Sequence, residues 1–150
     1  MHSSYLLRKG RVSKANHYYA ITLVCYERKN LLTNLIINRA VINEMKKLEK
    51  EKQINSNTFV LMPNHIHWLF QLNDIATLSE VIRNFKGRSA TAYREFSKQK
   101  LWQKGFYDHL VRSDEDLTHC ARYIVANPLR AHLIKNIADY PYWDSIYLNA

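Results

Sequence analysis

The stretch Met62-Pro63-Asn64-His65-Ile66-His67-Trp68-Leu69-Phe70 carries the clearest structural signal in this chain. Large apolar residues recur at every second position after Asn64, which predicts a β-strand because successive side chains of a strand point to opposite faces. One face would carry His65, His67, Leu69 and Gln71, and the other Ile66, Trp68, Phe70 and Leu72. The apolar face can pack against helices, while the two imidazoles stand together and could bind one metal ion. A half-buried strand that happens to carry two histidines fits the same pattern.

The composition is that of an ordinary globular protein with a strong basic excess. The 150 residues are 47% hydrophobic and 23% charged, and we expect them to form a single domain, 1–150. The net charge of +9 favours a polyanionic partner, most often nucleic acid, although a scattered basic surface would give the same sum. No segment has the length and apolarity of a membrane span or a signal peptide. Two cysteines fit neither a disulfide scaffold nor a zinc motif, so we expect reduced thiols and a cytoplasmic location.

The order of the expected elements predicts the fold class. We expect, along the chain, a strand at 18–26, a helix at 33–52 capped by Thr33, strands at 58–62 and from 65 joined by a Pro63-Asn64 turn, a helix at 77–97, a strand at 106–112, and a helix from the Ser113 cap to 127–128. The first six elements have the βαββαβ order of a ferredoxin-like α+β fold, an antiparallel sheet with two helices on one face. The additional C-terminal helix could then cover the face that carries the histidines.

That last helix contains a candidate nucleophile. Residues three or four apart share a helical face, so Tyr123 and Asn127 should project together, on one stripe with His119. Opposite two metal-binding histidines, a metal would polarise a phosphodiester and the phenolic oxygen would attack phosphorus. Tyr123 could equally be one of ten tyrosines that pack a ring and hydrogen-bond a hydroxyl.

Two longer motifs resemble those of one enzyme family. The runs Phe59-Val60-Leu61-Met62-Pro63-Asn64-His65-Ile66-His67 and Arg122-Tyr123-Ile124-Val125-Ala126-Asn127-Pro128-Leu129-Arg130-Ala131 resemble the REP-associated tyrosine transposases. These belong with the single-tyrosine insertion-sequence transposases of the HUH superfamily. Supporting matches are Tyr19-Ala20-Ile21-Thr22, Phe85-Lys86-Gly87, Trp102-Gln103-Lys104-Gly105-Phe106-Tyr107 and Tyr140-Pro141-Tyr142-Trp143-Asp144-Ser145. The resemblance covers almost the whole chain.

The resemblance implies an enzyme that cleaves and rejoins single-stranded DNA at hairpin-associated sites. Tyr123 matches the catalytic nucleophile that forms a 5′-phosphotyrosine link, and His65 and His67 match the metal ligands. Asn127 falls where relatives place a third ligand, and the implied ion is Mg²⁺ or Mn²⁺, of which Mn²⁺ suits nitrogen ligands better. The implied partner is single-stranded DNA with palindromic hairpins, and the resemblance leaves a homodimer and a monomer equally open.

Further residues are candidates for DNA contact. The cations expected to follow the DNA backbone are Arg8, Lys9, Arg11, Lys14, Arg83, Lys86 and Arg88. Trp102, Phe106 and Tyr107 could stack on bases, although core packing is expected for at least two of them. His109 could contact DNA, and His119 could relay a proton or simply face solvent.

Two other functions compete with the transposase. A non-catalytic nucleic-acid-binding regulator with the same fold would not need His65, His67 and Tyr123 together. A replication initiator or plasmid relaxase would use the same chemistry, but the short chain favours the transposase.

Overall fold

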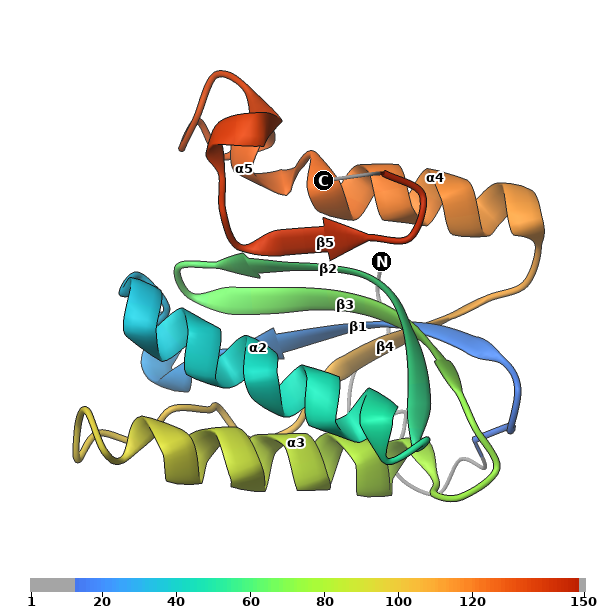
Figure 1. The fold of residues 1–150 in the computed structure, drawn as a ribbon, viewed down its shortest axis with the longest axis horizontal. Helices are drawn as coiled ribbons and strands as arrows, with labels where there is room; N and C mark the ends of the chain where they lie inside the picture. The colour runs from blue at the N-terminus through green and yellow to red at the C-terminus, as the bar shows by residue number, and fades with distance from the viewer. Residues whose placement is uncertain (1–12, 149–150) are drawn as a thin grey trace.

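A five-stranded antiparallel sheet organises the computed structural model, which describes residues 13–148 (Figure 1). The strands are β1 (Tyr18–Val24), β2 (Ile54–Met62), β3 (His65–Leu72), β4 (Tyr107–Val111) and β5 (Trp143–Ser145). They lie in the order β4-β1-β3-β2-β5, and every neighbouring pair is antiparallel. The first four strands with their helices have the predicted ferredoxin-like arrangement, and β5 extends the sheet beyond β2.

Helices cover both faces of the sheet (Figure 1). On one face lie α2 (Leu35–Lys50) and α3 (Leu78–Tyr93), and on the other lie α4 (Asp114–Val125) and the short α5 (Asn127–Arg130). Two 3-10 turns, η1 (Tyr26–Arg28) and η2 (Ile137–Asp139), complete the described elements. Because α4 shares its face with His65 and His67, the predicted approach of the last helix to the histidines is confirmed at the level of the fold.

The larger core lies between the sheet and the helices α2 and α3. Trp68 and Phe70 of β3 point into it, as the alternation predicts, and both are fully buried. The Trp68 ring lies 4.9 Å from that of Phe70 and 5.3 Å from that of Phe85 on α3, both in edge-on contact. Complete burial of each such side chain stabilises the fold by roughly 1.5–3 kcal/mol.

A smaller core joins α4 to the opposite face. Leu117, Ala121 and Ile124 of α4 pack on Leu69 and Val60 of the sheet. The aromatic C-terminal segment closes the side of this core, because the Tyr140 hydroxyl donates a 2.6 Å hydrogen bond to the Leu61 carbonyl oxygen. This core fixes α4, and therefore Tyr123, over the sheet.

Several element boundaries differ from the predictions. Asn34, and not Thr33, caps α2, because its side-chain oxygen accepts from the backbone amides of Ile36 and Ile37. β2 begins at Ile54, so the polar residues 55–57 do not interrupt it; they are accommodated by a β-bulge and by cross-strand hydrogen bonds. α3 ends at Tyr93, which leaves Phe96 exposed outside the helix.

The state of the two cysteines and the character of the helices can be described for residues 13–148. Cys25 and Cys120 are free thiols, and burial raises the pKa of Cys25 to about 12 and that of Cys120 to about 11. Such thiols are unreactive at neutral pH. Among these residues, no helix has both the length and the apolarity needed to cross a membrane.

Candidate active site

The two histidines lie on the central strand of the sheet, on the α4 face. His65 pairs with Val24 of β1 and Met62 of β2, and His67 pairs with Thr22 and Val60 on the same two strands. The two imidazole ring centroids are 4.7 Å apart, with their planes at 79°. The rings are therefore close enough to share one small ligand.

Hydrogen bonds hold each imidazole by its Nδ1 atom. His65 Nδ1 donates to the Asn64 side-chain oxygen at 2.7 Å, and His67 Nδ1 lies 2.9 Å from the Thr22 hydroxyl oxygen. When Nδ1 carries the proton, Nε2 keeps its lone pair, which is the form that binds a metal. Partners of this kind orient the ligating imidazoles of metal sites.

The electrostatic surroundings keep both histidines neutral. Burial lowers the pKa of His67 to about 3, with further contributions from the charges of His65 and Arg130. Burial and the charge of Arg28 also lower the pKa of His65. Both imidazoles are therefore unprotonated at neutral pH, as metal ligation requires.

Arg28 is held beside His65 by an unusual backbone. Glu27 and Arg28 in η1 have φ values of 52° and 55°, in the left-handed region that residues other than glycine seldom adopt. Each such residue costs of order 1–3 kcal/mol, and strain of this size is common at functional sites. This backbone conformation places the exposed cation Arg28 at the rim of the site.

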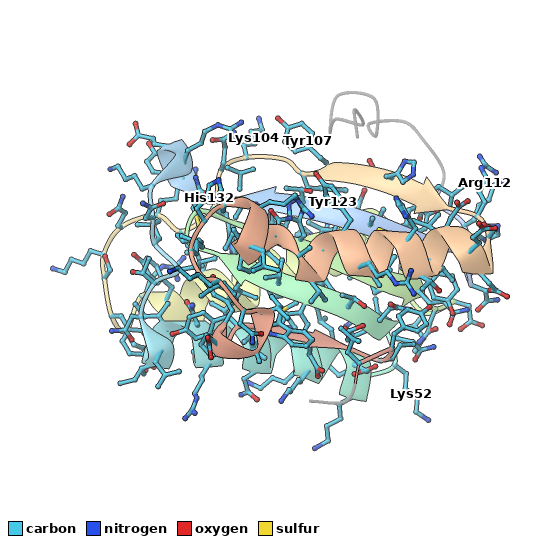
Figure 2. All side chains as sticks on the ribbon, turned by 90° about the horizontal axis from the view of Figure 1, so that it is seen from above. Lys52, Lys104, Tyr107, Arg112, Tyr123 and His132 are labelled. Atoms are coloured by element: carbon cyan, nitrogen blue, oxygen red, sulfur yellow. The ribbon has the colours of Figure 1, made fainter. Side chains whose placement is uncertain are left out.

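Tyr123 projects from α4 at the same face. The helix begins at its Ser113 cap, whose hydroxyl accepts from the Asp116 amide, and its apolar stripe packs on the sheet. Tyr123 lies outside that stripe and is 56% exposed, so it is not an ordinary core tyrosine. In Figure 2 it lies on the side of α4 toward β1 and β4.

Arg130 connects the tyrosine to the histidines. Its guanidinium carbon lies 3.8 Å from the centroid of the Tyr123 ring, and its Nη2 donates a 2.7 Å hydrogen bond to the Tyr123 carbonyl oxygen. The same positive charge contributes to the lowered pKa of His67. Arg130 therefore stacks on the ring of Tyr123 and acts electrostatically on His67.

Asn127 begins α5, directly after the break in the helix at Ala126. Pro128 lies in the first turn of α5, where backbone amides make no hydrogen bond within the helix, so the absence of an amide proton on proline costs nothing there. The Nδ2 atom of Asn127 is buried and has no hydrogen-bond partner within residues 13–148. Buried polar atoms are normally paired, so this amide has no hydrogen bond among the described residues that fixes its orientation through Nδ2.

The chemistry of two imidazoles and one amide suits a divalent ion. Residues 13–148 contain no cluster of three or more histidine, cysteine, aspartate or glutamate side chains placed to hold a metal. An ion here would rely on His65, His67 and Asn127. Rotation of the Asn127 amide by 180° would place its oxygen, which can bind a metal, where Nδ2 now lies. Three protein ligands leave coordination positions open, as a catalytic ion requires.

The basic residues predicted to follow DNA lie in different places. Arg8, Lys9 and Arg11 fall outside the described residues, and Lys14 is exposed. Arg83, Lys86 and Arg88 are on α3, across the sheet from the histidines, and Arg88 pairs with Glu51 at 2.8 Å. The Lys86 ammonium donates to the carbonyl oxygens of Gln103 and Gly105 at 2.7 and 2.6 Å, so it anchors the following loop.

The weaker candidates divide between core and surface. Trp102 is buried and its indole donates to the Ser89 hydroxyl at 2.9 Å, so it does not stack on a ligand. Phe106 and Tyr107 are half-buried, and His109 and His119 are exposed.

Thr22, Arg28 and Arg130 were not predicted as site residues. Arg130 follows Tyr123 by seven positions, but the helix breaks at Ala126 between them, so helical spacing alone does not place its side chain on the Tyr123 ring. Thr22 follows from the pairing of β1 with β3, and Arg28 depends on a loop conformation that no periodicity indicates.

The fold and the site together define a ferredoxin-like domain with a histidine pair on one strand and a tyrosine on the covering helix. The model of the family described as transposase IS200 like matches residues 13–127, which include both histidines and Tyr123. The chain belongs to the IS200-like transposase family, and it is an enzyme of DNA transposition. This confirms the family resemblance seen in the sequence.

Individual relatives agree with the family assignment. The chain is 28% identical over 125 residues to the REP-associated tyrosine transposase of Escherichia coli (strain K12), covering 77% of this chain and 67% of the relative. It is also 28% identical over 141 residues to a provisionally named REP-associated tyrosine transposase of Haemophilus influenzae, covering 83% of this chain and 77% of the relative. A solved structure of a REP-associated tyrosine transposase bound to a REP hairpin has the same fold, with a TM-score of 0.76 at 23% identity, covering 89% of this chain and 79% of that one.

Proposed function

We propose that this chain cleaves and rejoins single-stranded DNA at hairpin-associated sites, with Tyr123 as the nucleophile. The observation that carries the proposal is the meeting of two chain segments on one face of the sheet. The segment at β3 contributes two neutral imidazoles, each with its Nδ1 atom in a hydrogen bond. The segment at α4 and α5 contributes an exposed tyrosine and an unpaired buried amide.

In the proposed reaction the Tyr123 oxygen attacks the phosphorus of one phosphodiester. A new bond joins phosphorus to the phenolic oxygen as the bond from phosphorus to the 3′-oxygen breaks. The phenolic proton is lost to solvent, which reaches the half-exposed side chain, and the departing oxygen takes up a proton to become a 3′-hydroxyl. The product carries a 5′-phosphotyrosine, which a 3′-hydroxyl can attack in reverse to rejoin DNA.

The surrounding residues have separable roles in this reaction. His65, His67 and Asn127 would hold a divalent ion, Mg²⁺ or Mn²⁺, which when bound polarises the phosphodiester and offsets its charge. Thr22 and Asn64 orient the two imidazoles through Nδ1. Arg130 limits the rotation of the Tyr123 ring by stacking on it, and Arg28 and Arg130 make the site attractive to a phosphate.

The proposed substrate is a single strand that forms a hairpin. The net charge of +9 supports a polyanionic partner, and the relative of known structure is bound to a REP hairpin. Rejoining through a covalent intermediate needs no nucleotide cofactor, because the phosphotyrosine conserves the phosphodiester bond energy.

The test is covalent adduct formation with a labelled synthetic hairpin and Mn²⁺. We expect wild type to form a denaturation-resistant adduct and Tyr123→Phe to form none while binding the hairpin normally, since this change removes one oxygen and keeps the ring. Tyr107→Phe is the matched control and should behave as wild type. Adduct formation by Tyr123→Phe would contradict the assignment, and binding without any wild-type adduct would favour the non-catalytic regulator.

A further inference from the structure

A second anion-binding surface lies outside the proposed catalytic site. A groove of about 790 Å³ runs between α3 and the loop that leads from α3 to β4. Six cationic side chains and no carboxylate lie among its described lining residues: Arg83, Lys86, Arg94, Lys98, Lys100 and Lys104. Apart from Lys86, all of them are exposed.

The charge of this groove contrasts with that of the other side of the same helix. There α3 faces a surface where Arg88 pairs with Glu51 at 2.8 Å and Lys47 with Glu44 at 3.0 Å. Within the groove, the pKa of Lys86 is lowered to about 8 by its burial and by the charge of Lys100. Such a concentration of like charge is costly without an anionic partner, so charge complementarity selects a polyanion.

The groove also offers a close approach to backbone. Gly87 lies in the middle of α3, where glycine costs about 1 kcal/mol relative to alanine. A Cβ atom at Gly87 would meet nothing within 4 Å, so the packing of the domain gives no reason for a glycine there. Glycine is common where a ligand approaches the main chain closely.

The groove leads to the edge strand β4 of the same sheet whose central strand β3 carries the two histidines. Its last lining residue, Phe106, directly precedes Tyr107, which begins β4 and pairs with Thr22 of β1. Thr22 in turn pairs with His67, so Tyr107 and His67 share a face and are two strand spacings, about 10 Å, apart. Figure 2 shows Lys104 and Tyr107 close together at this edge, on the side of α4 where Tyr123 lies.

We propose that this groove binds a single-stranded segment of the DNA substrate that adjoins the cleaved phosphodiester. The proposal rests on the proposed function for the identity of the substrate. A volume within the ~300–1,000 Å³ range of small-molecule sites admits a few nucleotides and not a duplex. The five exposed cations would contact phosphates, and the half-buried Phe106 ring, with the partly buried Ala90 beside it, would contact bases.

Two variants and one matched control test the groove on a Tyr123→Phe background, which excludes cleavage. Lys98→Glu with Lys104→Glu reverses two exposed loop charges, and Arg39→Glu with Lys46→Glu makes the same charge change at exposed positions of α2. Gly87→Gln adds bulk without charge and uses a better helix former. The probes are a labelled oligothymidylate and a synthetic hairpin with and without oligothymidylate tails, and the affinity is measured against salt.

We expect the loop variant to bind the tailed hairpin at least tenfold more weakly than the α2 control does. The slope of log affinity against log salt should fall by about 1.4, which is about 0.7 for each of two lost phosphate contacts. Gly87→Gln should lose affinity for the tailed hairpin while keeping the wild-type melting temperature. Equal losses in the loop variant and the α2 control would overturn the proposal, as would a loss confined to the untailed hairpin. A loss in the loop variant combined with a wild type that forms no adduct would retain the groove and reject the transposase chemistry.

Discussion

Lowering the pH from 7 to 5 should destabilise the fold by about 2 kcal/mol through His67 alone. The pKa of this group falls from 6.5 in the unfolded chain to about 3 in the folded one. Between these values the unfolded chain takes up a proton that the native state refuses, so the stability is complete above pH 6.5 and is lost as the pH falls toward 3. Each pH unit in that window costs about 1.4 kcal/mol per group. The lowered pKa of His65 adds a loss of the same sign.

The assay is urea denaturation at pH 7, 6 and 5, with a chelator present so that bound metal does not stabilise the native state. His67→Asn keeps a hydrogen-bonding group opposite Thr22 and removes the titration. Between pH 7 and 5, His67→Asn should therefore lose about 2 kcal/mol less unfolding free energy than wild type loses. His109→Asn is the matched control, because it makes the same chemical change at an exposed position of β4. The reasoning is refuted if His67→Asn loses as much stability as wild type does over this range.

Four further outcomes are expected. Mixing His67→Ala with Tyr123→Phe should not restore adduct formation, because both groups lie on one face of a single chain; restored activity would instead indicate a dimer that shares its sites. In Mn²⁺ titration calorimetry, His67→Ala should abolish binding, Asn127→Ala should weaken it less, and Asn127→Asp should strengthen it; binding by His67→Ala equal to that of wild type would reject the metal site. Replacing Arg8, Lys9 and Arg11 together by alanine should flatten the salt dependence of hairpin binding by about 2 in the log–log slope, and an unchanged slope would mean that these residues do not contact DNA. Phe85→Ala should cost about 3–5 kcal/mol of stability, and a smaller loss in the same denaturation assay would show that the ring cluster tolerates repacking.

The sequence predicts the fold well where one periodicity dominates. The alternation in β3 assigns each of its residues to the correct face, because every inward position is large and apolar. The same holds for β1, whose Tyr19, Ile21 and Leu23 all enter the larger core. Two strands with assigned faces and two amphipathic helices leave few arrangements other than the observed one.

The missed start of β2 has a tertiary cause. Residues 55–57 are polar and resemble a loop, but the Trp68 indole donates to the Ser56 hydroxyl at 3.0 Å and the Asn55 amide donates to Gln71 at 3.1 Å. These bonds join β2 to β3 and cannot be anticipated from local propensity. The choice between Thr33 and Asn34 as the cap of α2 is similar, because both are favourable capping residues.

The candidate site divides in the same way. Period-two spacing places His65 and His67 on one face of β3, and helical spacing places Tyr123 outside the apolar stripe of α4. Arg28 depends instead on two left-handed residues in a turn, and Arg130 on the break between α4 and α5. The sequence therefore supplies the candidate metal ligands and the candidate nucleophile, whose roles stay predictions, and misses the two cations near them.

Those two cations have a consequence for the order of binding. The charge of Arg28 contributes to the lowered pKa of His65, and the charge of Arg130 contributes to that of His67. Both arginines would repel a divalent ion bound to these histidines for the same electrostatic reason. A bound phosphodiester would neutralise this repulsion, so DNA should tighten Mn²⁺ binding, and Mn²⁺ must tighten DNA binding by the same factor. Arg130→Leu should therefore strengthen Mn²⁺ binding to the free protein while reducing the coupling between metal and DNA. Titration of Mn²⁺ with and without hairpin measures both quantities. If Arg130→Leu leaves the coupling unchanged, the positive charge at this position does not link the two ligands.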